Sequence, residues 1–393
     1  MLEIKDKKVC CGCWACENIC PKHCISMIED EEGFLYPHVL ESECIHCNLC
    51  ENVCPILNHT EKSSSKQIAA IVQNKDKEVC RQSTAGGAFT AIAEYVLDRQ
   101  GVVYGVEMQK DYTVRHTTVE KKDDLVKFRN SKYVQSNLEN IFSSVKQQLN
   151  VGRWVCFSGT PCQVEGLRSY LKKDYKNLIL VDVVCRAVPS PGVWKRYIKM
   201  ETQKYGELQS IRFRDKTLGY QYSTMELKNG GGVYRGGIES QPWLRMFFSG
   251  MIIRPSCSAC KFRSRYRNSD FTIWDCFNVY SFDKNFDESI GTTRVLIHTE
   301  KGKQIFEAIK EKFYYKKLEA DIAVKDVREM RESPKEHIRK AEFYSDMEKL
   351  TMQELLDKYY PITFKIRIKR RARLILNSMG LDKTVKHILN KGK

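Results

Sequence analysis

The chain has 393 residues and a formal net charge of +16, with 65 Lys and Arg against 49 Asp and Glu. This length allows two or three domains with cores of their own, and no run of about 18 apolar residues is present to predict a membrane-spanning helix. Seventeen cysteines and a start that lacks an apolar leader indicate metal binding in a reducing cytoplasm rather than disulfides.

The chain begins with two copies of one cysteine spacing, C-x2-C-x2-C-x3-C followed by proline. The first run is Cys10, Cys13, Cys16 and Cys20, and the second is Cys44, Cys47, Cys50 and Cys54. In bacterial ferredoxins this spacing binds 4Fe–4S clusters, and the fourth cysteine of each run ligates the other run's cluster. The expected ligand sets are Cys10, Cys13, Cys16 with Cys54, and Cys44, Cys47, Cys50 with Cys20. Zinc sites usually use two pairs around a longer loop, so the doubled pattern favours single-electron transfer through iron–sulfur clusters.

The segment between the two runs, residues 25–40, predicts a β-hairpin that turns near Glu32 and Gly33. Such a hairpin brings the two runs together, as the exchange of ligands requires. The polar, serine-rich segment from His59 to Gln67 is typical of a linker. Residues 1–58 are therefore predicted to form a dicluster module.

Beyond the linker, strands and helices alternate irregularly. Strand-like segments lie at residues 68–73, 102–108, 112–120, 177–185, 208–216, 223–231, 233–238, 272–280 and 293–299. A glycine turn opens a helix within residues 84–101, a strand–turn–helix unit covers 153–171, and a further helix covers 302–313. This mixture predicts an α+β fold with a ferredoxin-like module, a mixed α/β body and a basic helical tail. The expected boundaries of the body and tail are 66–150, 151–345 and 346–393.

Six segments of the body occur in the order and spacing of one family. They are STAGGAFTAIA (83–93), FRNSKYVQS (128–136), FSGTPCQVEGL (157–167), VDVVCRAVPSP (181–191), RPSCSACKF (254–262) and SDFTIWD (269–275). On these motifs the chain resembles the beta subunit of coenzyme F420-reducing hydrogenase and its dehydrogenase relatives. The resemblance implies a flavin, usually FAD with FMN as the alternative, beside a third 4Fe–4S cluster.

The resemblance also implies the ligands of the third cluster, which spacing alone does not join. They are Cys162, Cys185, Cys257 and Cys260. Cys257 and Cys260 form a C-x2-C pair, but taken without the family Cys162 and Cys185 fit buried core thiols equally well. Of the other cysteines, Cys11 and Cys24 lie beside ligands in a module that is complete without them. Cys156 is expected in the core, Cys80 is either redox-active beside the flavin turn or, more in keeping with its surroundings, inert, and Cys276 is given no role.

The implied cofactor-binding residues come from three of the same motifs. They are Ser83, Thr84, Gly86, Gly87, Lys132, Gln135, Thr160 and Gln163. The small residues of the STAGG turn precede a helix, where backbone N–H groups can approach a phosphate, although such a turn is more often a simple connection. Lys132 and Gln135 offer a cation and an amide to a flavin or substrate, or belong to a solvated loop.

Three motifs depart from the family pattern, and in the first of them the usual S-G-G before the helix reads Ala85-Gly86-Gly87. The usual C-H-G-V-P-S-P has Arg186 and Ala187 in place of His and Gly, and the usual G-D-F-W-G keeps only Asp275. Since Trp274 replaces a glycine, the surroundings must differ in shape. These changes concern the substrate pocket more than the fold, so F420 itself is not assumed to be the partner.

The tail carries much of the net charge, because ten Lys and Arg residues and one Asp fall within residues 361–393, giving +9. Phe364, Ile368, Ala372, Ile375 and Met379 fall on one face of an expected helix that ends at Gly380. A basic amphipathic helix can lie on an anionic membrane surface or pack on the protein with its charges solvated. No nucleic-acid-binding motif accompanies it.

The expected function is that of a cytoplasmic oxidoreductase, which the tail can hold at the inner face of the membrane. It passes electrons between a hydride carrier or other reducible substrate (F420, NAD(P)H), a flavin, the clusters, and ferredoxin or a partner redox enzyme. One alternative is a flavin-free electron-transfer subunit. Another is a membrane-surface or redox-sensing protein with structural clusters. No constellation typical of hydrolytic catalysis is present, and no catalytic residue is assigned.

Overall fold

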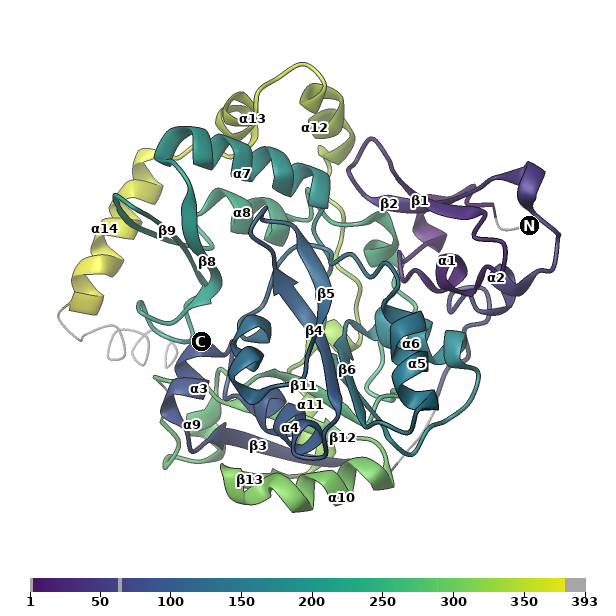
Figure 1. Cartoon of the computed structure of the whole chain (residues 1–393). Helices are drawn as coiled ribbons and strands as arrows, with labels where there is room; N and C mark the ends of the chain where they lie inside the picture. Colours follow the sequence, from purple (N-terminus) through teal and green to yellow (C-terminus); the bar gives the residue numbers. More distant parts are fainter. Residues whose placement is uncertain (1–2, 63–65, 288, 379–393) are drawn as a thin grey trace. The chain divides into compact units, whose positions relative to one another are not determined.

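The computed structural model describes residues 3–62, 66–287 and 289–378 (Figure 1). The chain forms two compact units. The first unit joins the chain up to Lys195 to Ile252–Glu336, and the second joins Arg196–Met251 to the chain from His337 onward. Among the described residues, no helix is long and apolar enough to cross a membrane.

An eight-stranded mixed sheet forms the centre of the first unit, in the order β13-β3-β12-β11-β7-β6-β4-β5. Its strands are β3 (Ile68–Asn74), β4 (Val102–Met108), β5 (Val114–Val119), β6 (Val155–Gly159), β7 (Leu178–Val183), β11 (Phe271–Asp275), β12 (Thr293–Ile297) and β13 (Phe313–Leu318). The four central strands, β11, β7, β6 and β4, pair in parallel, and the remaining pairs are antiparallel. Parallel strands are usually covered on both faces, which explains their almost continuous apolar sequences.

Helices cover both faces of this sheet. On one face α4 (Ala88–Leu97) and α10 (Glu300–Ile309) pack with the side chains of Val103, Ile179 and Val181. On the other face α5 (Ile141–Asn150) and α6 (Pro161–Leu171) pack with Tyr104, Phe157 and Leu180. This division follows from the alternation of side chains along each strand. Three shorter helices complete the body: α3 (Lys77–Gln82), α9 (Val279–Phe282) and α11 (Ala320–Val324).

Two differences from the sequence prediction have a clear physical reason. The strand expected over residues 272–280 ends at Asp275, because Val279 already begins α9. The strand β13, which the sequence analysis missed, is an edge strand whose four central residues are exposed. An edge strand with solvent on much of its surface lacks the apolar alternation by which a buried strand is found.

The N-terminal module belongs to the same unit as the sheet. It contains α1 (Ala15–Ile19), α2 (Leu49–Asn52) and an antiparallel hairpin of β1 (Ile25–Glu29) and β2 (Leu35–Val39), as the sequence predicts. The hairpin turn lies against the body at Gly33, where an added Cβ would be 2.5 Å from the Cα of Gly192. Gly33 has φ +78°, so both its conformation and its contact require glycine.

The second unit contains a three-stranded antiparallel sheet and several helices. Its strands are β8 (Leu208–Asp215), β9 (Thr224–Asn229) and β10 (Gly232–Gly237), in the order β10-β9-β8. Its helices are α8 (Pro242–Ser249), α12 (Lys340–Met347), α13 (Met352–Tyr359) and α14 (Phe364–Ser378), together with most of α7 (Pro191–Tyr205), which begins in the first unit.

Candidate iron–sulfur centres

The eight cysteines of the two runs surround two separate cavities. The first cavity, of about 370 Å³ including space open to solvent, is lined by Cys10, Cys13, Cys16 and Cys54. The second, of about 390 Å³ on the same measure, is lined by Cys20, Cys44, Cys47 and Cys50. The fourth cysteine of each run thus crosses to the other run's cavity. The structure brings together the same two groups that the spacing predicts.

Backbone conformation explains how each run wraps around its cavity. Gly12 and Trp14 in the first run have positive φ, and so do His46 and Asn48 at the corresponding positions of the second run. These left-handed residues turn the chain sharply between the cysteines. In the first run backbone N–H groups then hydrogen-bond to the sulfurs, Gly12 to Cys10 for example. Hydrogen bonds to sulfur are a main determinant of cluster reduction potential.

A buried arginine completes the first cavity. Arg254 is 0 % exposed and donates to the carbonyl oxygens of Cys10 (2.8 Å) and Leu35 (3.0 Å) and to Oε1 of Gln135 (3.0 Å). Its Nη2 also lies 3.5 Å from the Cys10 sulfur, and its guanidinium lies 4.2 Å from the centroid of the Tyr36 ring. None of these partners is a carboxylate, and in the described part of the chain Arg254 forms no ion pair. A buried cation requires an anion, and a cluster held by four thiolates supplies one, so these residues fit the group.

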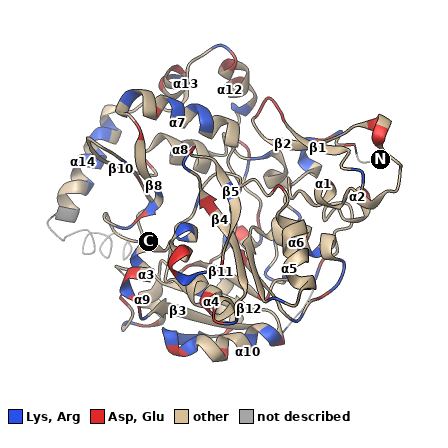
Figure 2. Ribbon diagram, viewed as in Figure 1, with Lys and Arg blue, Asp and Glu red and all other residues tan. Residues whose placement is uncertain are grey.

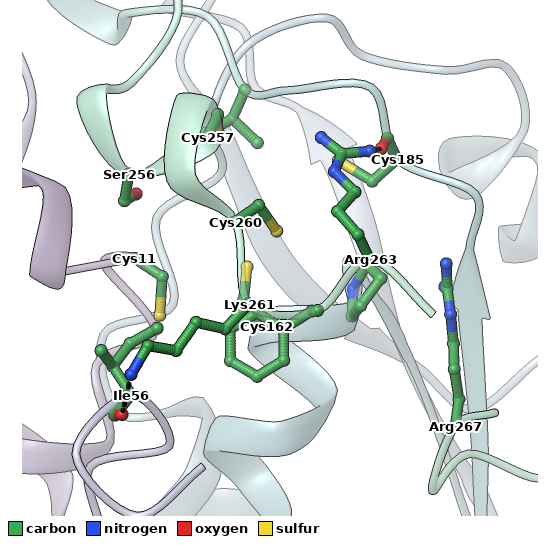
Figure 3. Close-up of a pocket in the computed structure, with 13 residues that line it drawn as sticks. Cys11, Ile56, Cys162, Cys185, Ser256, Cys257, Cys260, Lys261, Arg263 and Arg267 are labelled. Carbon is green, nitrogen blue, oxygen red and sulfur yellow. Dashed lines mark hydrogen bonds between the residues drawn. The ribbon is translucent and has the colours of Figure 1, made fainter. Parts of the chain in front are cut away.

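A third cavity lies beside the sheet, and five cysteines line it (Figure 3). It encloses about 510 Å³, including space open to solvent. Four of the cysteines are those of the predicted third cluster, Cys162, Cys185, Cys257 and Cys260, and the fifth is Cys11. The rest of the lining includes three cations, Lys261, Arg263 and Arg267.

Sheet topology explains how these distant cysteines converge. Cys162 follows β6 as the second residue of α6, and Cys185 follows β7. Because β6 and β7 are neighbouring parallel strands, their carboxyl ends reach the same edge of the sheet. Cys257 lies in a short 3₁₀ helix, Pro255–Ala259, and Cys260 ends it. The strand order therefore supplies the contact that spacing along the sequence could not.

Burial disfavours free thiolates at three of the cysteines that line the third cavity. Burial raises the pKa of Cys257 to about 12 and also raises the pKa values of Cys185 and Cys260, because a thiolate loses its hydration there. Iron offsets this loss by binding the thiolate directly. Among the described residues, no group of three or more His, Cys, Asp or Glu side chains is placed to hold a single metal ion. In a 4Fe–4S cluster the four thiolates surround several irons and do not converge on one.

Cys11 lies between two of the cavities, a role that the sequence analysis missed. It lines both the first and the third cavity. A hydrogen bond from Cys11 lowers the pKa of Cys162 to about 7 and also lowers the pKa of Cys13, while both contacts raise the pKa of Cys11 itself. Cys11 therefore lies as a thiol between cysteines of the first and third cavities. The only sequence signal was the adjacent pair Cys10–Cys11.

The residues that the resemblance assigned to a flavin fall into two groups. Thr84 Oγ1 lies 2.9 Å from Ser131 Oγ, so the STAGG turn with Ser83, Gly86 and Gly87 lies next to Lys132. The amide of Gly86 donates to Thr293 Oγ1 at 2.8 Å, and an added Cβ there would be 2.4 Å from the carbonyl oxygen of Val72. Gly86 is thus fixed by packing on β3, and the phosphate role predicted for this turn depends on the amides that follow it at the start of α4.

The second group lies near the clusters instead. Gln135 donates to the carbonyl oxygen of Cys11 at 3.3 Å while accepting from Arg254. Thr160 and Gln163 cap α6 reciprocally, and the amide of Gln163 also donates to Ser136 Oγ at 3.0 Å. These three side chains position the segments that carry Cys11 and Cys162. Their predicted contact with a flavin remains a prediction.

Comparisons with known proteins follow the same division of the chain. The model for the C terminus of the coenzyme F420 hydrogenase/dehydrogenase beta subunit matches residues 152–322, and the model for the N-terminal part of the same protein matches residues 70–143. The model for a 4Fe-4S dicluster domain matches residues 9–57. Curated proteins gave no match.

Among solved structures, the F420-reducing [NiFe] hydrogenase complex from Methanosarcina barkeri, studied by xenon derivatization, contains a similar chain. The similarity covers 76% of this chain and 94% of that one, at 14% identity and a TM-score of 0.42. The family models together span more than half of the residues. The chain therefore belongs to the coenzyme F420 hydrogenase/dehydrogenase beta subunit family and is an iron–sulfur electron-transfer subunit with a dicluster domain at its N-terminal end.

Proposed function

We propose that this protein is an oxidoreductase subunit that conducts electrons through three 4Fe–4S clusters in a fixed order. The observation that carries the proposal is the convergence of Cys162, Cys185, Cys257 and Cys260 on one cavity, with Cys11 shared between that cavity and the first cavity of the module. The order is then third cavity, first cavity, second cavity, in either direction of flow.

The exposure of the cysteines supports this order. In the first cavity Cys13 and Cys16 are buried, whereas Cys47 in the second cavity is exposed. Electron exchange with another protein requires close approach to a cluster, so the second cavity is the natural contact point for ferredoxin or a partner redox enzyme. The first cavity lies between the second cavity and the third cavity of the body in this order.

A flavin, when bound, exchanges a hydride with a two-electron substrate and single electrons with iron–sulfur clusters. In this chain the flavin would be held by the turn around Thr84 and Gly87, which contacts Ser131, the neighbour of Lys132. The chain's own part is to hold the thiolates, to direct N–H groups at the sulfurs and to bury the clusters, which together set their potentials. The substrate is a small redox molecule such as F420 or NAD(P)H. The departures from the family pattern at Arg186, Ala187 and Trp274 concern the substrate pocket and therefore the choice between these molecules.

Anaerobic purification with quantified iron, sulfide and flavin tests the proposal. We expect about twelve irons per chain, releasable FAD or FMN, and reduction by F420H2, NAD(P)H or reduced ferredoxin. The Cys162→Ser variant should lose one cluster. The matched control, Cys156→Ser, alters a buried thiol in the core of β6 and should keep the full iron content.

Three outcomes separate the alternatives. Iron near eight per chain, with Cys162, Cys185, Cys257 and Cys260 open to alkylation, would overturn the third cluster. Twelve irons without flavin would identify a subunit that only conducts electrons. Turnover without any bound flavin would remove the proposed role of the Thr84 turn.

A further inference from the structure

Helix α14 turns its apolar face away from the protein. Phe364 is 77% exposed, Ile368 is 51% exposed and Ile375 is 57% exposed, and Ala372 between them is also exposed. Their spacing of four, four and three places them along one side of the helix. These four residues are called the apolar stripe below. Met379 and Gly380, which the sequence analysis assigned to the same helix, lie outside the described residues.

The opposite face of α14 attaches to the second unit, and it does so through arginines. Arg370 donates to the carbonyl oxygen of Arg235 at 3.0 Å, with its guanidinium 4.9 Å from the centroid of the Tyr234 ring. Arg373 lies 3.6 Å from the centroid of the Tyr222 ring and pairs with Glu239 at 3.3 Å. An amphipathic surface helix normally buries its apolar side. Here polar and cation–π contacts fix the helix with the apolar stripe outward.

Cations flank the apolar stripe on both sides. At 100° per residue, Arg367 and Arg371 fall along one edge, and Lys365 and Lys369 fall along the other. All four are exposed, and α14 contains six Lys and Arg residues with no Asp or Glu. In Figure 2 this helix shows the blue of Lys and Arg and none of the red of Asp and Glu.

This pattern matches the surface of an anionic bilayer better than a protein groove. A single helix that is fixed along its far side presents a narrow convex ridge, which a flat lipid surface can meet along its whole length. Long basic side chains on both edges can then extend to phosphates while the stripe enters the boundary between headgroups and acyl chains. An acidic protein partner would need a groove with carboxylates along both of its rims.

We propose that α14 docks the protein on an anionic membrane surface, with the apolar stripe inserted and Lys365, Arg367, Lys369 and Arg371 paired with lipid phosphates. The proposal is independent of the cluster assignment. It gives the protein a reversible peripheral attachment, since no described helix can span the membrane.

Vesicle co-sedimentation of the full-length, anaerobically purified protein tests the proposal. The probes are vesicles of phosphatidylcholine alone and with about 40% phosphatidylglycerol, at low salt and at 0.5 M salt. We expect binding only to the anionic vesicles, weakened strongly by salt because the screening length shortens to a few ångströms. The variant with Gln at all four flanking cations should bind at least about 50-fold more weakly, because each cation near such a surface contributes roughly a fivefold factor.

A second variant separates insertion from charge. Phe364→Ser with Ile368→Ser and Ile375→Ser keeps every cation and should bind at least tenfold more weakly. The control, Ile338→Ser, removes an isoleucine that is 96% exposed in the same unit but outside α14, and it should bind like the wild type. All variants should keep the wild-type iron content. Unchanged vesicle binding by the serine variant would overturn the proposal. Failure of the wild type to bind anionic vesicles would also overturn it, and loss of a protein partner from the serine variant would then identify the stripe as a protein-binding surface.

Discussion

Replacing Arg254 by methionine should lower the reduction potential of the cluster in the first cavity. Arg254 is buried beside the Cys10 sulfur, and its hydrogen-bond partners are neutral oxygens apart from that sulfur. Reduction adds one negative charge to the cluster, and a nearby cation stabilises the more negative state. Removing the cation therefore disfavours reduction, which moves the potential down.

The structure sets the size of the effect. The guanidinium Nη2 lies 3.5 Å from the Cys10 sulfur, but the added electron is shared across the whole cluster. With an average separation of about 8 Å and an effective dielectric constant of about 20, the interaction is about 2 kcal/mol. For a one-electron couple this corresponds to about 90 mV. Arg254→Lys keeps the charge but loses the forked donor geometry, so its shift should be smaller.

Potentiometric titration followed by electron paramagnetic resonance measures each cluster separately. The cluster in the second cavity serves as an internal reference and should shift little. Arg339→Met removes the same charge from an exposed pair with Glu342 in the second unit, and it should leave every potential unchanged. A fully loaded Arg254→Met protein whose first cluster keeps the wild-type potential would refute the electrostatic reasoning.

Three further results follow from the contacts of buried side chains. Cys11→Ala should keep the iron content but lower the potentials of the two flanking clusters by tens of millivolts, since hydrogen bonds to sulfur raise them, and Cys11→Ser should restore part of the shift. Burial lowers the pKa of His116 to about 4, so its neutral form stabilises the fold fully above about pH 6.5. That contribution, about 3 kcal/mol, is lost as the pH falls towards 4; chemical denaturation of His116→Gln should show a smaller loss over the same range than the wild type. Arg267→Met leaves Asp182 buried without the cation that lies 2.7 Å from it, so the free energy of unfolding should fall by about 3–5 kcal/mol. Adding Asp182→Asn to this variant removes the unpaired charge and should recover part of the loss.

The local parts of the site could be predicted from the sequence because short spacing determines them. Cys10, Cys13 and Cys16 lie within seven consecutive residues, in a loop and the first turn of α1, so their chemistry follows from their order along the chain. The hairpin β1–β2 follows from alternation on either side of a turn with Gly33. Both signals arise within about ten residues, a distance at which backbone geometry alone limits the outcome.

Contacts between distant segments could not be predicted in the same way. Cys162 and Cys185 meet because β6 and β7 are adjacent and parallel, which only the strand order reveals. Arg254 lies 244 positions from Cys10 in the sequence, and although it opens the RPSCSACKF motif, nothing in that motif points to the first cavity. Tail periodicity identified the apolar stripe of α14 correctly, but the direction it faces depends on the docking of Arg370 and Arg373.

The polar segment at residues 59–67 predicts a linker between module and body, and other contacts hold the module in place. Asn18 of α1 donates to the carbonyl oxygen of Glu139 at 2.6 Å, Gly33 packs on Gly192, and Arg254 joins Cys10 to Gln135. These three contacts come from separate parts of the module, so together they prevent both rotation and separation. A tethered ferredoxin that moved freely would have to collide with the body for every electron. On the order proposed above, a docked module keeps Cys11 between the first and third cavities, so no transfer within the chain would depend on diffusion, whereas exchange between the second cavity and a partner would.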